Sequence, residues 1–366
     1  MKKLAYLVIG ILIILGLGRL LTAKLQQTNT VSKTQGIPVT TIPTIKTTPL
    51  HSVPLTNISR SIFVPYWASA VNEEAKTYDM YYYFGIRPTK EGEIDNDSGL
   101  QNVILVKSIP EIQKKVVLRM LDTTVTEVIL QDKTAQKKLF SEIDKILSTY
   151  SFSGIIIDLE MPYTIKAEKS EQITKFVQQL CTAIKSDYKT CEMLVYGDFL
   201  YRNRPYNLKA LGETVDRILI MTYDFHKAGG EPGPNFPFDR RSLKGEGGFD
   251  YGYDFKQMVS DVISLVSKDK IEVVFGMYGY DWTMNEQGTP LKSAAALSLN
   301  GIELKAKSLK LKINSNGAKE KYINYTDEEG LHHIIWYEDK ESAAIKTKYL
   351  QEQGIGRVSF WAHSYY

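Results

Sequence analysis

The sequence has little of what marks several common classes of protein. Its net charge is only +3 over 366 residues, so it lacks the strongly basic surface with which many proteins bind nucleic acid. It has two cysteines, Cys181 and Cys191, and no cysteine and histidine spacing that fits a metal site. We therefore expect no nucleic-acid partner, no metal and no other cofactor, and we expect a monomer.

Long apolar runs are also missing, with one exception at the amino terminus. A basic start leads into the uncharged run Leu4–Gly18, which predicts export. The run is shorter than the ~20 residues of a typical membrane span, but Leu21 stands where a cleaved signal peptide would carry a small residue. For residues 1–23 we favour an uncleaved membrane anchor over a removed signal peptide. The protein is then expected at the extracellular face of the membrane, or secreted if the segment is cut.

Two further features, a linker and a pair of cysteines, are interpreted as parts of an exported chain. Residues 24–59 are rich in Thr, Ser and Pro, which predicts a disordered tether without a core. Disulfides persist outside the cell. Because Cys181 and Cys191 flank a predicted helix-to-strand turn, a local disulfide and two unpaired thiols both stay open.

The stretch Gly154–Glu160 organises the rest of the chain. Three isoleucines and Leu159 make a short apolar run, typical of a strand buried on both faces of a parallel sheet. Strand side chains alternate, so Ile156, Asp158 and Glu160 share one face. Burial and mutual repulsion raise the pKa of one of two such carboxyls, which lets it donate a proton while the other stays charged. The plainer alternative is two acids in solvent at a strand end.

Seven further apolar segments predict strands, and helical periodicity appears between several of them. The alternation predicts an α/β fold, a closed (β/α)8 TIM barrel, over residues 60–366. Strands are expected at Ser61–Trp67, Met80–Ile86, Lys115–Met120, Gly154–Glu160, Glu192–Tyr196, Arg217–Tyr223, Glu272–Met277 and Arg357–Trp361, and helices at Thr134–Tyr150, Glu171–Ser186, Asp254–Val266 and Asp339–Gln353.

An extra segment, residues 283–334, separates strand seven from the last helix. Within it, Ile302–Ile313 interleaves lysines with leucines mostly at period two, which predicts a small inserted sheet with one wet face. Its four lysines are interpreted as solvated positions, and contact with an anionic polymer is the alternative. They are Lys305, Lys307, Lys310 and Lys312.

Polar and aromatic residues gather where several strands end, which is where barrels of this kind carry their chemistry. They are Asp158 and Glu160 on strand four, Tyr223 and Asp224 after strand six, Tyr278 and Tyr280 after strand seven, and Trp361 at the end of strand eight. Their convergence favours a functional site over solvated strand ends.

Motifs on three of these strands resemble those of a known family. Ser153–Glu160 resembles the pattern Asp-Gly-x-Asp-x-Asp-x-Glu of glycoside hydrolase family 18, the chitinase-type barrels, and keeps its last acid pair. Met221–Asp224 is similar to the family's Met-x-Tyr-Asp signature, and Trp361 stands where the family has its pocket-floor tryptophan. Gly276–Trp282 and Ile335–Asp339 look like the branch of cell-wall and spore-cortex lytic enzymes, whose small α+β insertion the segment after strand seven also resembles.

The resemblance implies substrate-assisted, retaining hydrolysis of β-linked polymers that contain N-acetylglucosamine. It makes Glu160 the general acid and later the base, and makes Asp158 the group that orients the substrate's own 2-acetamido group for attack on the anomeric carbon. It implies that Tyr223 hydrogen-bonds that acetamido group, that Asp224 contacts the sugar nearby, and that Trp361 stacks under it.

Three more residues are expected to bind substrate at the same mouth. They are Met221, Tyr66 and Tyr280. Further aromatic residues near the strand ends could line subsites or fill the barrel interior; they are Trp67, Tyr82, Phe84 and Tyr196. His226 could touch substrate or pack its loop, and the direction of Arg119 is open.

Two residues depart from the family pattern, because Ser153 and Ile156 stand where it has acids. In the family the middle acid accepts a hydrogen bond from the equivalent of Asp158, which isoleucine cannot do. We therefore expect Asp158 to be held facing Glu160, with hydrolysis that persists but is slower or shifted in its pH optimum.

Three functions are compatible with the sequence. The leading one is a hydrolase of peptidoglycan or a chitin-like polymer, with peptidoglycan favoured. A noncatalytic carbohydrate-binding protein on the same barrel is the main alternative, since a fold does not determine a function; the retained Glu160 argues against it, because a lectin needs no proton donor there. The third is an accessory protein of wall assembly that uses the barrel as a platform.

Overall fold

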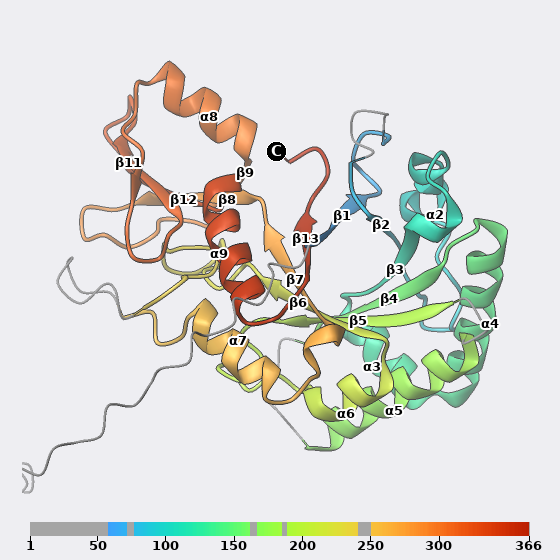
Figure 1. Cartoon of the computed structure of the whole chain (residues 1–366). Helices are drawn as coiled ribbons and strands as arrows, with labels where there is room; N and C mark the ends of the chain where they lie inside the picture. The colour runs from blue at the N-terminus through green and yellow to red at the C-terminus, as the bar shows by residue number, and fades with distance from the viewer. Residues whose placement is uncertain (1–57, 72–76, 162–166, 185–188, 241–249, 366) are drawn as a thin grey trace, which may run out of the picture. The chain divides into compact units, whose positions relative to one another are not determined.

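The computed structural model describes residues 58–71, 77–161, 167–184, 189–240 and 250–365. Eight parallel strands close into a barrel in the order β1-β13-β7-β6-β5-β4-β3-β2 (Figure 1), which confirms the predicted TIM barrel. The barrel strands are β1 (Ser59–Pro65), β2 (Met80–Ile86), β3 (Lys114–Met120), β4 (Gly154–Leu159), β5 (Thr190–Tyr196), β6 (Arg217–Thr222), β7 (Ile271–Gly276) and β13 (Arg357–Trp361).

The predicted membrane anchor and nearly all of the predicted tether lie outside the described residues. Within the described ranges, no helix is both long enough and apolar enough to cross a membrane.

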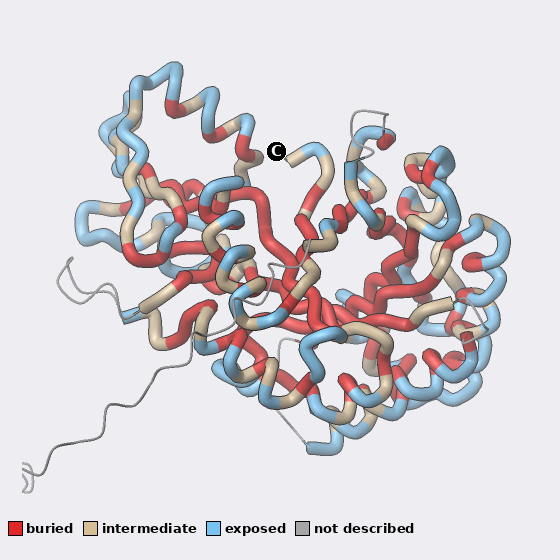
Figure 2. The backbone as a smooth tube through the Cα atoms, viewed as in Figure 1, coloured by how far each residue is buried: buried red, intermediate tan, exposed pale blue. Residues whose placement is uncertain are grey.

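Helices pack around the barrel with their apolar faces inward, as the alternation of buried and exposed backbone shows (Figure 2). The four predicted helices are confirmed as α4, α5, α7 and α9 with slightly different ends. The helices and turns are α2 (Ser98–Gln101), η1 (Asn102–Val106), η2 (Glu111–Gln113), α3 (Thr123–Gln131), α4 (Lys133–Thr149), α5 (Ala167–Ile184), α6 (Leu208–Thr214), α7 (Phe255–Ile263), η4 (Lys268–Lys270), α8 (Leu299–Ser308) and α9 (Lys340–Glu352).

Local sequence explains where these helices begin. The carboxylate of Asp132 accepts hydrogen bonds from the first backbone N–H groups of α4, and Asp254 and Asp339 cap α7 and α9 in the same way. The apolar stripe of α4 that predicted a helix is buried in the structure. Capping and periodicity therefore agree along the same segment.

The amino ends of the strands hold charged side chains that pair inside the barrel. Lys115 contacts Glu192, and Arg217 lies 3.3 Å from Glu192 and 3.2 Å from Glu272. The hydroxyl of Tyr82 donates to Glu272 at 3.0 Å, so this ring fills the interior, one of the two alternatives that the sequence left open. Two cations and two carboxylates offset each other, as buried charges require.

The inserted segment forms a separate antiparallel sheet in the order β10-β11-β12-β8-β9. Its strands are β8 (Tyr278–Met284), β9 (Ala295–Ser298), β10 (Asn314–Ser315), β11 (Lys321–Thr326) and β12 (His332–Tyr337). The sheet lies beside the barrel and is partly covered by α8 (Figure 1). It begins at Tyr278, before the predicted start of the insertion, so β8 continues almost directly from the barrel strand β7.

The prediction of a strand over Ile302–Ile313 is wrong, because most of that segment is the helix α8. The hydroxyl of Ser298 caps the helix at the backbone N–H of Gly301, and Ile302 and Ala306, four residues apart, are buried on one side. Lys305 is also not a free solvated lysine, since its amine lies 2.6 Å from Asp281. The apparent period of two came mostly from the lysines, and lysine is a residue that favours helices.

A disulfide joins Cys181 on α5 to Cys191 on β5, with a Cα–Cα distance of 5.4 Å. Both residues are buried. Of the two possibilities that the sequence left open, the structure therefore has the local bond between the helix and the next strand.

Candidate active site

The barrel register places the predicted site residues at the carboxyl end of the strands. Tyr196 at the end of β5 is in register with Met221 on β6, and Gly276 at the end of β7 with Trp361 on β13. Asp158 lies one residue before the end of β4. Residues two apart on each strand face the same side, so these side chains converge at one mouth of the barrel.

Asp158 and Glu160 are shielded from solvent rather than free in it. Asp158 is 2% exposed, and its Oδ1 atom has no hydrogen-bond partner in the described residues. Burial, followed by the charge of Glu160, raises the pKa of Asp158 well above its usual range, and Arg119 opposes the rise. Burial also raises the pKa of Glu160. The interpretation as two solvated acids is therefore wrong, and the pair retains a proton to higher pH than separate carboxyls would.

Tyr196 holds the carboxylate of Glu160. Its hydroxyl donates a hydrogen bond to Oε2 of Glu160, which favours the ionised form and partly offsets the effect of burial on the pKa of Glu160. Two cations lie over the tyrosine ring, the guanidinium of Arg204 at 4.3 Å and the amine of Lys227 at 5.3 Å from its centroid. Arg204 is itself held by Asp198 through two bonds of 3.1 Å.

Trp361 and Tyr223 form an aromatic wall of the mouth. Their ring centroids are 6.4 Å apart with planes 23° from parallel, and Phe84 packs edge-on against Trp361 at 4.7 Å. Burial raises the pKa of Tyr223 well above its usual value, and the nearby charges of Asp158 and Glu160 add to the rise. The Tyr223 hydroxyl therefore stays protonated and available as a hydrogen-bond donor. Phe84 is buried and supports the wall.

Asp224 joins the barrel to the inserted sheet. It follows β6 with a left-handed backbone (φ +56°), which aspartate tolerates better than most residues. The hydroxyls of Tyr278 and Tyr280, both on β8, donate to its Oδ1 atom, the latter at 2.8 Å. The insertion thus supplies two tyrosines to the same cluster, one of them the predicted Tyr280.

Tyr66 and Met221 are buried to different degrees. The guanidinium of Arg119 is 4.5 Å from the centroid of the Tyr66 ring, and Arg119 also pairs with Asp97 at 3.2 Å. Tyr66 is half-buried beside the mouth, whereas Met221 is 4% exposed and packs beneath it. The open question about Arg119 is answered, since its charge reaches Asp158 across neighbouring strands.

Sequence reasoning did not assign the cations Lys227 and Arg204 to the site, and it left Tyr196 undecided. Lys227 is three residues after Asp224, so its position on the loop after β6 was a usable signal. Arg204 comes from the connection between β5 and β6, where no motif marks it. Trp67 is 49% exposed, with its ring 6.1 Å from that of Trp361.

His226 packs its loop, one of the two roles considered for it. Its Nδ1 atom lies 2.8 Å from the carbonyl oxygen of Pro234, and its ring meets those of Phe225 and Tyr251. Burial lowers the pKa of His226 to about 4, so the ring is neutral near pH 7. The described residues contain no group of three or more His, Cys, Asp or Glu arranged to hold a metal ion.

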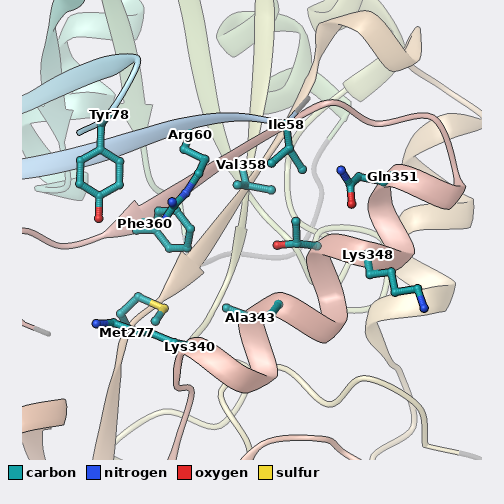
Figure 3. Close-up of a pocket in the computed structure, with 12 residues that line it drawn as sticks. Ile58, Arg60, Tyr78, Met277, Lys340, Ala343, Lys348, Gln351, Val358 and Phe360 are labelled. Atoms are coloured by element: carbon teal, nitrogen blue, oxygen red, sulfur yellow. The ribbon is translucent and has the colours of Figure 1, made fainter. Parts of the chain in front are cut away.

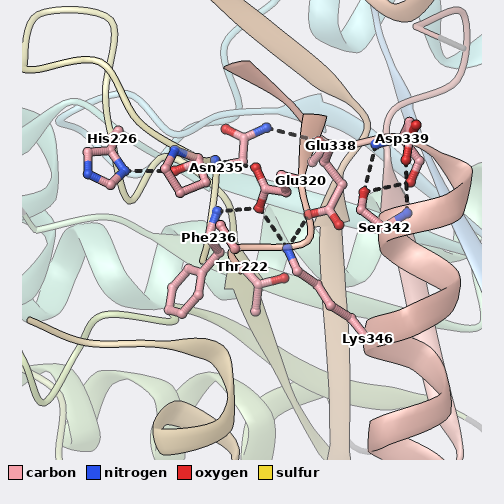
Figure 4. Close-up of polar contacts among 12 residues, drawn as sticks. Thr222, His226, Asn235, Phe236, Glu320, Glu338, Asp339, Ser342 and Lys346 are labelled. Atoms are coloured by element: carbon pink, nitrogen blue, oxygen red, sulfur yellow. Dashed lines mark hydrogen bonds and ion pairs between the residues drawn. The ribbon is translucent and has the colours of Figure 1, made fainter. Parts of the chain in front are cut away.

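A buried ion cluster fixes the loop that carries Asp224 (Figure 4). The carboxylate of Glu320, just before β11, accepts hydrogen bonds from the backbone N–H groups of Asn235 (2.6 Å) and Phe236 (2.8 Å). The amine of Lys346 on α9 donates to Glu320 at 2.7 Å and to Glu338 at 2.8 Å. These three charged side chains are fully buried.

The same loop is tied to the strands of the site. The side-chain amide of Asn235 donates to the carbonyl oxygens of Gly276 (3.1 Å) and Tyr278 (2.9 Å). Because those carbonyls bracket the passage from β7 to β8, the ion cluster positions both partners of the Tyr278–Asp224 contact.

A cavity of about 400 Å³ lies away from the mouth, between α9 and the strands β1 and β13 (Figure 3). Residues such as Ile58, Ala343 and Phe360 line it. None of the predicted site residues does, so this cavity belongs to a different part of the surface.

The sequence matches one protein family over most of the barrel. Residues 125–365 match Glycosyl hydrolases family 18. The cortical fragment-lytic enzyme of Bacillus anthracis is 28% identical over 305 residues, which cover 78% of this chain and 64% of the relative. Human di-N-acetylchitobiase is 20% identical over 240 residues, 59% of each chain. The chain thus spans less than two thirds of these relatives.

Solved structures show the same fold. The spore cortex-lytic enzyme SleL of Bacillus cereus superposes with a TM-score of 0.65 at 23% identity, covering 85% of this chain and 72% of that one. A chitinase of Chromobacterium violaceum gives a TM-score of 0.67 at 19% identity, covering 84% and 95%. With the family match extending over more than half of its residues, the chain belongs to glycosyl hydrolases family 18.

Proposed function

We propose that the protein is an exported hydrolase of β-linked polymers that contain N-acetylglucosamine, with peptidoglycan as the preferred substrate and chitin-like polymers as the second. The observation that carries the proposal is the pair of buried Asp158 and partly buried Glu160, both with raised pKa, beside the aromatic wall of Trp361 and Tyr223. Peptidoglycan comes first because the relatives include cortical fragment-lytic enzymes.

In the proposed first step, protonated Glu160 gives its proton to the glycosidic oxygen as that oxygen leaves the anomeric carbon. The carbonyl oxygen of the substrate's own 2-acetamido group forms the new bond to this carbon, giving a cyclic cation. The one proton that the pair retains lies on Glu160 in this step, so Asp158 is ionised; it accepts the acetamido N–H, and its negative charge offsets the developing positive charge. Positioned acid catalysis of this kind contributes roughly 10² to 10⁴ in rate.

In the second step the carboxylate of Glu160 takes a proton from water. The water oxygen attacks the anomeric carbon and displaces the acetamido oxygen from it, which opens the ring of the cyclic cation. The configuration at that carbon is retained after two displacements. The raised pKa of Glu160 suits both steps, because the group must hold a proton near neutral pH and then accept one back.

The remaining predicted residues hold the sugar during these steps. The Tyr223 hydroxyl, kept protonated by burial, donates to the acetamido oxygen before it attacks. Trp361 stacks under the apolar face of the sugar. Asp224, fixed by two tyrosine hydroxyls, contacts the sugar beside them, and Tyr66 and Tyr280 border the same mouth.

The proposal is tested with the full-length chain on purified peptidoglycan and on chitooligosaccharides, by measuring the release of reducing ends. We expect release from peptidoglycan, a smaller release from the oligosaccharides, and loss of both in Glu160→Gln. The variant should still bind the polymer. Binding without any release by the wild type would favour the carbohydrate-binding alternative, and unchanged release by Glu160→Gln would contradict the role of Glu160.

A further inference from the structure

A second cavity, of about 640 Å³, lies outside the barrel at the amino end of β3. The connection from β2 to β3 contains only the short α2 and the turns η1 and η2, where barrels of this type usually place a full helix. The space left is bounded by η1 and by the turn from α4 to β4. Its volume is in the range of small-molecule sites.

This cavity is separate from the mouth of the barrel. Lys114, which lines it, begins β3, whereas Arg119 near the end of the same strand contacts the site. Five residues of a strand span on the order of 16 Å. A ligand in the cavity would therefore meet none of the residues of the proposed reaction.

Lys114 is a mostly buried residue whose amine has no charged partner in the described residues. The residue is 6% exposed, and its amine lies 5.6 Å from the centroid of the Phe152 ring. In the described ranges it makes no hydrogen bond or ion pair through this amine. Glu111, the nearest acid to influence it, is instead paired with Lys189 at 3.0 Å.

The charges around the cavity have one sign. Two lysines, Lys107 and Lys114, line it, and no aspartate or glutamate does. Burial lowers the pKa of Lys114, and Glu111 only partly opposes this. The Lys114 ammonium is partly removed from water and has no ion-pair partner in the described residues, so an anion placed beside it would be favoured.

The other walls favour an apolar body attached to that anion. Leu100, Val103 and Phe152 supply aliphatic and aromatic surface, while Asn96 and Gln101 add polar groups. The single unpaired amine of Lys114 matches one negative charge, so a singly charged head leaves the complex neutral. A phosphate with two charges would need a second cation inside the cavity, and Lys107 is exposed.

We propose that this cavity binds a small amphipathic carboxylate, with its head on the Lys114 amine and its apolar body against Leu100, Val103 and Phe152. The site is independent of the proposed hydrolysis, since it shares no residue with it. Its occupant neutralises the unpaired charge of Lys114 and covers apolar surface of Leu100 and Val103 that is otherwise open to water.

The test is calorimetric titration of octanoate into the full-length protein. We expect one octanoate per chain, binding at least tenfold weaker in Lys114→Met, and unchanged binding in Lys137→Met, which removes an exposed lysine on the neighbouring helix α4. Octylammonium, with the same chain and the opposite charge, should bind at least tenfold more weakly than octanoate.

A second variant covers the possibility that Lys114→Met perturbs the fold. Val103→Phe fills the cavity without touching the amine and should also weaken octanoate at least tenfold. Thermal unfolding of each variant checks that the protein is folded. No octanoate binding to the wild type, equal binding by Lys114→Met, or equal binding of octylammonium would each overturn the proposal.

Discussion

Tyr196 governs the proton of Glu160 through a single hydrogen bond. Removing it in Tyr196→Phe takes away an interaction with the ionised carboxylate, so the pKa of Glu160 should rise further. Because the general acid must be protonated, we expect the alkaline limb of the kcat/KM profile to move up by about one pH unit, given ~1.5 kcal/mol for a bond to a charged group.

The control for that change is Tyr206→Phe. The Tyr206 hydroxyl donates to the backbone carbonyl of Leu159 at 2.7 Å rather than to a carboxylate. Its removal tests the effect of a lost hydroxyl on fold and packing, and it should leave the alkaline limb of the kcat/KM profile unchanged. A Tyr196→Phe profile that superposes on the wild type would show that the bond does not set the titration of Glu160.

Ile156 is the second residue whose replacement is informative. It is fully buried, two residues before Asp158 on the same interior face, and one carboxylate oxygen of Asp158 has no partner among the residues that the structure describes. In Ile156→Asp the added carboxyl can share a proton with Asp158, so we expect a displaced pH optimum and a several-fold faster reaction at that optimum. Ile156→Val offers no such partner and should keep the wild-type profile, and identical profiles for all three proteins would reject the coupling.

The individual residues show how far sequence could reach. Strand alternation placed Asp158 and Glu160 on one face, the strand ends brought Tyr223, Asp224 and Trp361 to the same mouth, and the resemblance implied their roles. Lys227 could have been found from its place three residues after Asp224, but Arg204 could not, because it acts through the ring of Tyr196 and no motif marks it. Contacts between loops of different strands depend on packing, which leaves no local pattern in the sequence.

Among the elements, the inserted sheet and α9 are joined by the buried cluster of Lys346, Glu320 and Glu338. One ammonium faces two carboxylates, and burial raises the pKa of Glu338 to about 8. A raised folded-state pKa stabilises the protein below the ordinary value of 4.5, and this contribution is lost as the pH rises through 8. We expect the wild-type Tm to fall between pH 5 and pH 9, and to fall less in Glu338→Gln.

The matched control is Glu352→Gln, an exposed glutamate at the end of α9. Its Tm should follow the wild type over the whole range. If Glu338→Gln also follows the wild type, the proton on Glu338 contributes nothing to the pH dependence of folding.

The disulfide is the second inter-element contact with a measurable consequence. It joins α5 to β5 across 10 residues, a loop for which chain-entropy estimates give about 3 kcal/mol. Cys181→Ser with Cys191→Ser should lower the free energy of unfolding in urea by about that amount, and reduction of the wild type should have the same effect. Equal stability of oxidised protein and double variant would contradict the estimate.

Two independent signals agree in several of the correctly predicted elements, whereas the one segment that was assigned wrongly was interpreted from a single signal. In α4 the Asp132 cap and the apolar stripe agree, and β4 combines isoleucines with flanking turns. Over Ile302–Ile313 only the apparent period of two was used, while the Ser298 cap and the buried pair of Ile302 and Ala306 indicate the helix that forms. The capping residue was the signal that could have corrected the prediction.

At the level of the whole molecule, the proposed reaction needs a barrel mouth with one wall from the barrel and another from the inserted sheet. The barrel supplies the carboxyl pair and the wall of Trp361 and Tyr223, and the inserted sheet supplies Tyr278 and Tyr280. The closed eight-stranded order was predictable from the alternation of strands and helices. The start of β8 within the site was not, because β7 and β8 run on without a turn signal.

The central claim is that Glu160 delivers the proton to the leaving oxygen. The most direct measurement compares kcat/KM of the wild type and Glu160→Gln on two substrates with the same N-acetylglucosamine chain, one with a sugar leaving group and one with 2,4-dinitrophenolate, which leaves without a proton. We predict a loss of at least ~100-fold on the first and less than ~10-fold on the second. An equal loss on both substrates, or no loss on either, would contradict the account.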